Sequence, residues 1–266
     1  MKRTTLAGLA GLAALPALGW VALGPLSAQN AEAPQDGGIA ADLDRAEVEA
    51  IVHDYLMENP DVIVAALQRW QDAQALAAEA DTEAAAREAI PALMAASSGV
   101  AMGAGPDEAE VLVAEFFDYH CGYCKRATDF VMDLAEEDGV RVVFQDLPIL
   151  REESRGAALA GLAAAETGAY AEMHRQLMRA GGVLDEDAVA KAARRAGARD
   201  ALGTLAQADA RAALEAKLDA SIDLARGMGL SGTPAFVIAA PDGGFVRVVP
   251  GYDKDAVRAA VEAARG

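Results

Sequence analysis

The sequence contains few of the residues on which many structural and binding roles depend. Only two of its 266 residues are cysteine and three are histidine. Two cysteines exclude a disulfide-rich scaffold, and they exclude a zinc site made of four cysteines. Positive charge is also scarce, because 23 Lys and Arg stand against 41 Asp and Glu, for a formal net charge of −18. This negative surplus argues against nucleic acid or anionic lipid as a partner.

The sequence is rich in small apolar residues. Hydrophobic residues make up 53% and charged residues 24%, which argues against disorder along most of the chain. Much of the hydrophobic fraction is alanine, whereas aromatic residues make up 5%. Alanine favours helix more than any other residue, so we expect a protein with a large helical content.

Residues 1–28 are typical of a secretory signal peptide. Lys2 and Arg3 precede an uncharged apolar run from Leu6 to Leu26, and small residues follow up to Ala28. The run is also long enough for an uncleaved membrane anchor, which is the alternative interpretation. We expect cleavage after Ala28 and export to the periplasm, an oxidising compartment.

Residues 29–97 precede the main domain in two parts. Residues 29–41 are polar and contain Pro34 and two adjacent glycines, which indicates a linker. Residues 42–97 have a helical apolar pattern, interrupted at Asn59-Pro60, where one helix ends and the next begins. The apolar stripe needs a partner, either the rest of the chain or a second copy. We therefore expect an oligomerisation segment over residues 42–97.

Residues 98–266 combine short apolar runs with longer helical patterns, which predicts an α/β domain. The short runs suit buried strands, and they cover residues 111–117, 140–147, 235–239 and 245–249. The helical patterns cover residues 121–134, 153–227 and 253–265. The first two strands and the helix between them would form a right-handed βαβ unit.

Cys121 and Cys124 lie in a Cys-Gly-Tyr-Cys sequence that directly follows the first strand and opens a helix. The N–H groups and the dipole at the start of a helix lower the pKa of a cysteine there. Cys121 would then attack a disulfide as a thiolate, and Cys124, one turn later, would resolve the mixed disulfide. His120, directly before Cys121, would assist when protonated.

Two other interpretations of the cysteine pair are weaker. A structural disulfide would close a four-residue ring, which stabilises the fold by only ~1.9 kcal/mol in the loop-entropy treatment. A zinc site would need His120, His53 or His174 to converge on the pair, and their spacing does not indicate this. Two thiolates could instead hold Cu(I). His174 more often belongs to a helix core.

Three segments in the same order resemble the DsbA-type thioredoxin-fold thiol–disulfide oxidoreductases. They are Glu115–Lys125, Val140–Leu150 and Gly229–Ile238. Residues 51–63 are similar to the N-terminal helical segment of the suppressor-of-copper-sensitivity protein C group within that family. The resemblance implies a thioredoxin-like α/β fold with an inserted helical region, preceded by an N-terminal α-helical arm. It implies no cofactor, and no metal ligand is assigned.

The resemblance also implies a set of site residues. Cys121 would be the nucleophile and Cys124 the resolving thiol, with Pro234 as a cis-proline packed against them. Glu115 would be a buried acid that exchanges the proton of Cys124. Pro234 could instead be an ordinary proline at a strand start, and Glu115 could face outward. The residues expected to contact the client are Thr233 through its backbone, Gly232, His120 and Tyr123.

The resemblance favours a disulfide isomerase over a simple dithiol oxidase. The Gly122-Tyr123 pair and Thr233 resemble the periplasmic isomerases, and in the suppressor group the N-terminal segment can assemble the protein into oligomers. The expected partners are cysteine-containing exported client proteins, a membrane redox partner that resets the cysteines, and further copies of this chain. An oxidase is the alternative within the family; a Cu(I)-binding protein and a holdase chaperone are alternatives of another class.

Overall fold

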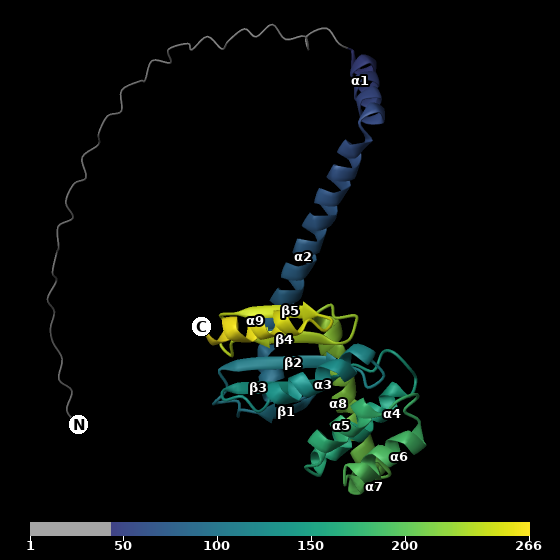
Figure 1. The fold of residues 1–266 in the computed structure, drawn as a ribbon, viewed down its shortest axis with the longest axis vertical. Coiled ribbons are helices and arrows are strands. Elements are labelled where there is room, and N and C mark those ends of the chain that lie inside the picture. Colours follow the sequence, from purple (N-terminus) through teal and green to yellow (C-terminus); the bar gives the residue numbers. More distant parts are fainter. Residues whose placement is uncertain (1–43) are drawn as a thin grey trace, which may run out of the picture. The chain divides into compact units, whose positions relative to one another are not determined.

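The computed structural model describes residues 44–266 (Figure 1). The chain divides into two units between Ile63 and Val64, and each is described by itself. The predicted signal peptide (1–28) and linker (29–41) lie outside the described residues. Within residues 44–266, no helix has the length and apolar character needed to cross a membrane.

The first helix, α1 (Arg45–Glu58), begins at a reciprocal capping box. The Asp44 carboxylate accepts a hydrogen bond from the Glu47 N–H at 2.9 Å, and the Glu47 carboxylate accepts one from the Asp44 N–H at 3.1 Å. The helix ends where the Asn59 side-chain amide donates to the Tyr55 carbonyl at 2.8 Å. The second helix, α2 (Pro60–Ala95), starts at a proline, which needs no N–H partner there. The predicted break at Asn59-Pro60 is therefore present.

The C-terminal part of α2 belongs to the core of the second unit. Ala86, Ala89, Ile90 and Leu93 are buried against the sheet. The apolar pattern of residues 42–97 predicts a segment separate from the α/β domain, whereas in the structure these residues have two roles. The last turns of α2 are part of the domain, and the preceding turns carry the exposed apolar residues.

The second unit is built on a five-stranded mixed sheet with strand order β1-β3-β2-β4-β5. The strands are β1 (Val100–Gly103), β2 (Val111–Phe117), β3 (Val140–Asp146), β4 (Ala235–Ala239) and β5 (Val246–Pro250). Strands β2 and β3 are parallel and joined by α3 (Gly122–Leu134), as predicted, and the other pairs are antiparallel. The helices of the insertion between β3 and β4 are α4 (Ser154–Glu166), α5 (Tyr170–Arg179), α6 (Glu186–Arg195), α7 (Arg199–Leu205) and α8 (Ala208–Gly227), and α9 (Lys254–Arg265) closes the chain.

Both faces of the sheet are covered, which explains why every residue of β2 and β3 is buried and why most of them are apolar. Alternate residues of β2 enter two separate cores. Val113 and Phe117 face the core formed with α3, α9 and the inserted helices, while Leu112 and Phe116 face the core formed with α2 and α8. Helices α4 to α7 lie together at one end of the sheet (Figure 1). This arrangement confirms the predicted α/β fold with an inserted helical region.

Strand β1 was not predicted. It lies in residues 97–106, which the sequence analysis treats as a boundary because they are small and contain glycine. It pairs antiparallel with β3, from Val100 beside Phe144 to Gly103 beside Arg141. Four residues with two neighbouring glycines carry almost no strand pattern, so this edge strand depends on the exposed edge of β3.

Candidate functional site

Cys121 and Cys124 lie where β2 ends and α3 begins, and both are free thiols. Cys121 is the N-cap residue of α3. Its Sγ accepts a hydrogen bond from the Cys124 N–H at 3.4 Å, and its carbonyl accepts one from the Lys125 N–H at 3.0 Å. The sulfur therefore takes the place of the side-chain oxygen that usually caps a helix.

The surroundings of Cys121 favour the thiolate. The largest cause is a hydrogen bond from the Cys124 thiol, which lowers the pKa of Cys121 to about 5 although burial opposes it. Thr233 and the backbone N–H groups of Cys124 and Tyr123 lower it further. In the thiol form Cys121 Sγ donates to the Thr233 carbonyl at 3.1 Å. The Thr233 hydroxyl has no partner among the described residues, so it is available to the thiolate.

Cys124 has the opposite environment. It is fully buried, and burial is the largest cause that raises the pKa of its thiol well above the ordinary value, followed by its hydrogen bond to Cys121 and the charge of Glu115. The two thiols, one helical turn apart, thus differ in which protonation state the fold favours. Cys121 is suited to attack and Cys124 holds its proton.

Glu115 lies on β2 with both carboxylate oxygens buried and without a hydrogen-bond partner in the part of the chain that the structure describes. Burial raises the pKa of Glu115 to about 8, and the negative charge of Cys121 adds to the shift. The outward alternative for this residue is wrong, because Glu115 is fully buried and shares a face of β2 with Val113 and Phe117. The carboxyl is therefore protonated at neutral pH and electrostatically coupled to both cysteines.

The loop before β4 approaches the cysteines from another part of the sequence. The peptide bond between Thr233 and Pro234 is cis, and the Pro234 carbonyl accepts a hydrogen bond from the Gly251 N–H at 2.8 Å. Thr233 contacts Cys121 as described above. A Cβ built on Gly232 would meet no atom within 4 Å, so this residue borders open space.

His120 does not take the position that the sequence analysis gives it. Its Nε2 accepts a hydrogen bond from the Leu184 N–H at 3.0 Å, so this nitrogen carries no proton. Its Nδ1 is 2.8 Å from the Ser154 hydroxyl. Burial lowers the pKa of His120 against an opposing effect of Asp118, and the histidine is not among the groups that shift Cys121. The expected help from a protonated His120 is therefore a wrong prediction.

Asp118 organises the segment that ends at Cys121, and the sequence analysis missed it. Its buried carboxylate accepts hydrogen bonds from the Ser154 hydroxyl and the His120 N–H, both at 2.8 Å. It also accepts from the N–H groups of Ile149 and Leu150, both at 2.9 Å. These bonds join the end of β2 to the chain after β3 and to the start of α4. The signal in the sequence was an acidic residue directly after a mostly apolar strand.

The two remaining candidates, Tyr123 and His174, differ in solvent exposure. Tyr123, between the two cysteines, is exposed, and the Arg126 guanidinium lies 4.0 Å from its ring centre. His174 is fully buried, with the Tyr119 hydroxyl 3.2 Å from Nδ1, and burial lowers its pKa to about 3. This agrees with the prediction that His174 belongs to a helix core. Within residues 44–266, no group of three or more His, Cys, Asp and Glu side chains could hold a metal ion.

Two family profiles match the chain. The DSBA-like thioredoxin domain matches residues 112–261, and the copper resistance protein ScsC N-terminal domain matches residues 44–77. The first match covers more than half of the chain and includes all of β2 but its first residue, both cysteines and the cis-proline loop. The second covers α1 and the first half of α2.

Solved structures of similar proteins cover most of the described residues. BcfH of Salmonella enterica Typhimurium is 27% identical, with a TM-score of 0.72 over 83% of this chain and 96% of that chain. Proteus mirabilis ScsC in a transitional conformation is 27% identical, with a TM-score of 0.56 over 84% and 99%. A thioredoxin-like oxidoreductase from Silicibacter pomeroyi is 36% identical, with a TM-score of 0.56 over 65% and 95%.

Matches among curated proteins are local. The chain is 42% identical over 77 residues to the Na(+)/H(+) antiporter NhaA 3 of Salinispora tropica, and it spans 12% of that protein. A match of this extent describes a shared segment and says nothing of the antiporter's activity.

The pKa of Cys121 predicts its reactivity with pH. Alkylation of the reduced protein by iodoacetamide should reach half its maximal rate near pH 5, since only the thiolate reacts. Cys124→Ala should raise this midpoint, because it removes the hydrogen bond that contributes most to the shift. A midpoint near pH 8.5 in the unaltered protein would contradict the described geometry.

Burial of Glu115 predicts a pH-dependent gain in stability from Glu115→Gln. The carboxyl binds its proton more tightly in the folded protein, so its favourable contribution is complete below pH 4.5 and is lost as the pH rises towards 8. The free energy of unfolding of the variant minus that of the unaltered protein should therefore rise by about 1.4 kcal/mol for each pH unit in this window. Urea unfolding of both reduced proteins between pH 4.5 and 8.5 measures the difference, and a constant difference would overturn the prediction.

Proposed function

Because the chain belongs to the family of DSBA-like thioredoxin domains, we propose that it is an exported disulfide isomerase that acts on proteins through Cys121 and Cys124. The observation that carries the proposal is the contrast between the two thiols. Cys121 favours the thiolate, and the buried Cys124 keeps its proton. Reduced protein of this kind begins a reaction by attack on a client disulfide.

In the first step, Cys121 Sγ bonds to one sulfur of a client disulfide and the client S–S bond breaks. The other client sulfur leaves as a thiolate. The Cys124 thiol, the Thr233 hydroxyl and the N–H groups at the start of α3 stabilise the thiolate before the attack. Their arrangement favours the thiolate as leaving group when Cys121 is released again.

The mixed disulfide has two exits. In isomerisation, the client thiolate or another client cysteine attacks a client sulfur and finally displaces Cys121, so no electrons are gained or lost overall. In the second exit, Cys124 loses its proton and attacks Cys121 Sγ, which releases the client reduced and leaves a Cys121–Cys124 disulfide. We assign Glu115 as the group that takes the Cys124 proton after its own proton has left, and Glu115→Gln should slow this exit while leaving the first attack intact.

The high pKa of Cys124 supports isomerisation over net transfer. A Cys124 thiol that holds its proton attacks Cys121 Sγ slowly, so the mixed disulfide has time to rearrange. The proposal includes a membrane redox partner, because an isomerase works only while Cys121 is reduced. Export is supported by the basic and apolar residues at the start of the sequence.

The N-terminal arm, defined as α1 and the first half of α2 (residues 45–77), supports an oligomer. In the part of the arm that belongs to the first unit of the chain, Ile51 is 58% exposed and Tyr55 is 55% exposed. In the part that belongs to the second unit, Leu67 is 53% exposed and Trp70 is 61% exposed. Apolar side chains exposed in this number along one segment indicate an interaction surface. The match of residues 44–77 to the ScsC N-terminal domain is consistent with this assignment. We propose that copies of this chain associate through the arm.

Refolding of scrambled ribonuclease tests the enzymatic proposal. The reduced protein should restore ribonuclease activity with catalytic amounts of enzyme, and Cys121→Ala should abolish this. The protein is purified from the periplasm of the host. Its intact mass also tests export, because it should equal the mass of residues 29–266. Oxidation of reduced ribonuclease without rescue of the scrambled form would instead identify an oxidase.

Charge in the arm tests the oligomer. Ile51→Asp should lower the mass measured by light scattering to that of one chain, because a carboxylate cannot be buried in an apolar interface without a large cost. Gln68→Asp, which adds the same charge at another exposed position, is the control. Recovery of scrambled ribonuclease should fall in Ile51→Asp, whereas Cys121 alkylation stays unchanged. An unaltered protein that is already a single chain would end the proposal.

A further inference from the structure

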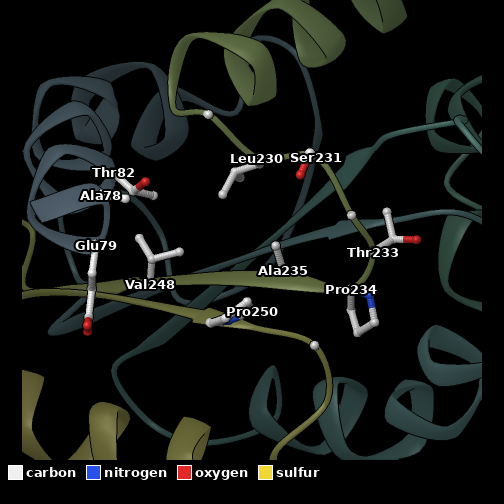
Figure 2. A pocket seen from close by; sticks show the side chains of 13 residues that line it. Ala78, Glu79, Thr82, Leu230, Ser231, Thr233, Pro234, Ala235, Val248 and Pro250 are labelled. Carbon is white, nitrogen blue, oxygen red and sulfur yellow. The ribbon is translucent and has the colours of Figure 1, made fainter. Parts of the chain in front are cut away.

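A cavity of about 540 Å³ lies between α2 and the loop that carries Pro234 (Figure 2). One wall is the middle of α2, with Ala78, Glu79 and Thr82. Figure 2 shows the loop from Leu230 to Pro234 across the cavity from these side chains, and Val248 and Pro250 of β5 near its base. All of these residues belong to the second unit.

The α2 wall is held in place by contacts with β5 and with the turn that precedes it. Glu79 pairs with Arg247 of β5, and Glu83 lies 3.3 Å from the same guanidinium. Arg87 donates to the Gly243 carbonyl at 3.0 Å. Ala86 and Ile90, in the same part of the helix as Arg87, enter the core with residues of β4 and β5. The helix therefore forms a fixed wall, and the pairing with Arg247 neutralises its only carboxylate on the cavity.

The opposite wall leads to the reacting sulfur. Thr233 lines the cavity, and its carbonyl accepts the hydrogen bond from Cys121 Sγ. Among residues 44–266, nothing accepts a hydrogen bond from the backbone N–H groups of Ser231, Gly232 and Thr233. An extended peptide that lies beside this loop would find backbone donors along one side, as in strand addition.

We propose that α2 is the second wall of the client cleft, and that Ala78 and Thr82 select extended client segments with small or apolar side chains beside the reactive cysteine. This inference rests on the proposed function. The charged side chain of the lining, Glu79, is already paired with Arg247. Apart from the Ser231 and Thr233 hydroxyls, the rest of the lining is apolar or backbone, so it offers no free charged partner for a client charge. Thr82 lies close to the start of this loop, because a Cβ built on Gly229 would be 3.8 Å from the Thr82 hydroxyl oxygen.

The choice of a polypeptide as occupant follows from continuity with the cysteines. The cleft has backbone donors on one side, apolar side chains at its base and a helix on the other side, and it passes the atom that contacts Cys121. A small disulfide needs only the sulfur and the Thr233 side of this arrangement. A client chain that continues beyond its cysteine must enter the space beside α2.

Filling the cleft from the α2 side tests the inference. Ala78→Trp and Thr82→Trp place an indole in the space, and Ala80→Trp, on the opposite side of the same helix, is the matched control. Two disulfide probes are compared by the rate at which the reduced protein releases the probe's own thiol: the disulfide-linked dimer of the peptide Ala-Val-Cys-Val-Ala, and oxidised glutathione. Melting temperature and the pH midpoint of Cys121 alkylation verify that each variant is folded and has an unaltered thiol.

We expect Ala78→Trp and Thr82→Trp to react at least tenfold more slowly with the peptide disulfide and as fast as the unaltered protein with glutathione. Ala80→Trp should match the unaltered protein with both probes. If both cleft variants are folded and react with the peptide at the unaltered rate, α2 is not part of the client site. If the unaltered protein fails to react with either disulfide, the proposed function itself is wrong.

Discussion

A helix that begins at the edge of a buried sheet presents N–H groups that its own carbonyls cannot satisfy, and in this chain Cys121 lies in front of them. The apolar strand β2 delivers the chain to this point, and the Asp118 carboxylate fixes the turn by four hydrogen bonds. The sulfur is then both a helix cap and a nucleophile. The thiolate is stabilised most by the hydrogen bond from the Cys124 thiol, and further by N–H groups that the fold must satisfy in any case. A chain with a net charge of −18 therefore does not need an adjacent cation for it.

Burial favours the neutral form of the neighbouring groups, whereas these hydrogen bonds favour the charged form of Cys121. It raises the pKa of Cys124 and of Glu115, and it lowers the pKa of His120 and His174. The neutral form of each of these four groups is therefore favoured, whereas Cys121 favours the thiolate. The arrangement gives the site one reactive sulfur and a nearby carboxyl that carries a proton at neutral pH.

Much of the fold followed from local sequence patterns. The strands 111–117 and 235–239 were found because both of their faces are buried, and the cysteine pair was found because its spacing and position carry chemistry. Strand β1 has no such pattern of its own and exists through its pairing with β3. The role of Asp118 depends on Ser154, which is 36 residues away, and the cleft depends on Thr82 meeting a loop near Gly229. Such contacts between distant segments are tertiary features, and the single sequence has no periodicity that marks them.

One consequence of the continuous α2 helix concerns its phase. Leu67 and Trp70 are exposed, Ala78 and Thr82 line the cavity, and Ile90 and Leu93 are in the core, all on one uninterrupted helix. Each residue turns such a helix by about 100°. Insertion or deletion of a single residue between Trp70 and Ala78 would rotate the exposed apolar side chains around the helix axis while the cleft and the core stayed in place. Length changes in this stretch would therefore be tolerated in multiples close to whole turns, whereas substitutions at its exposed polar positions would not be restricted in this way.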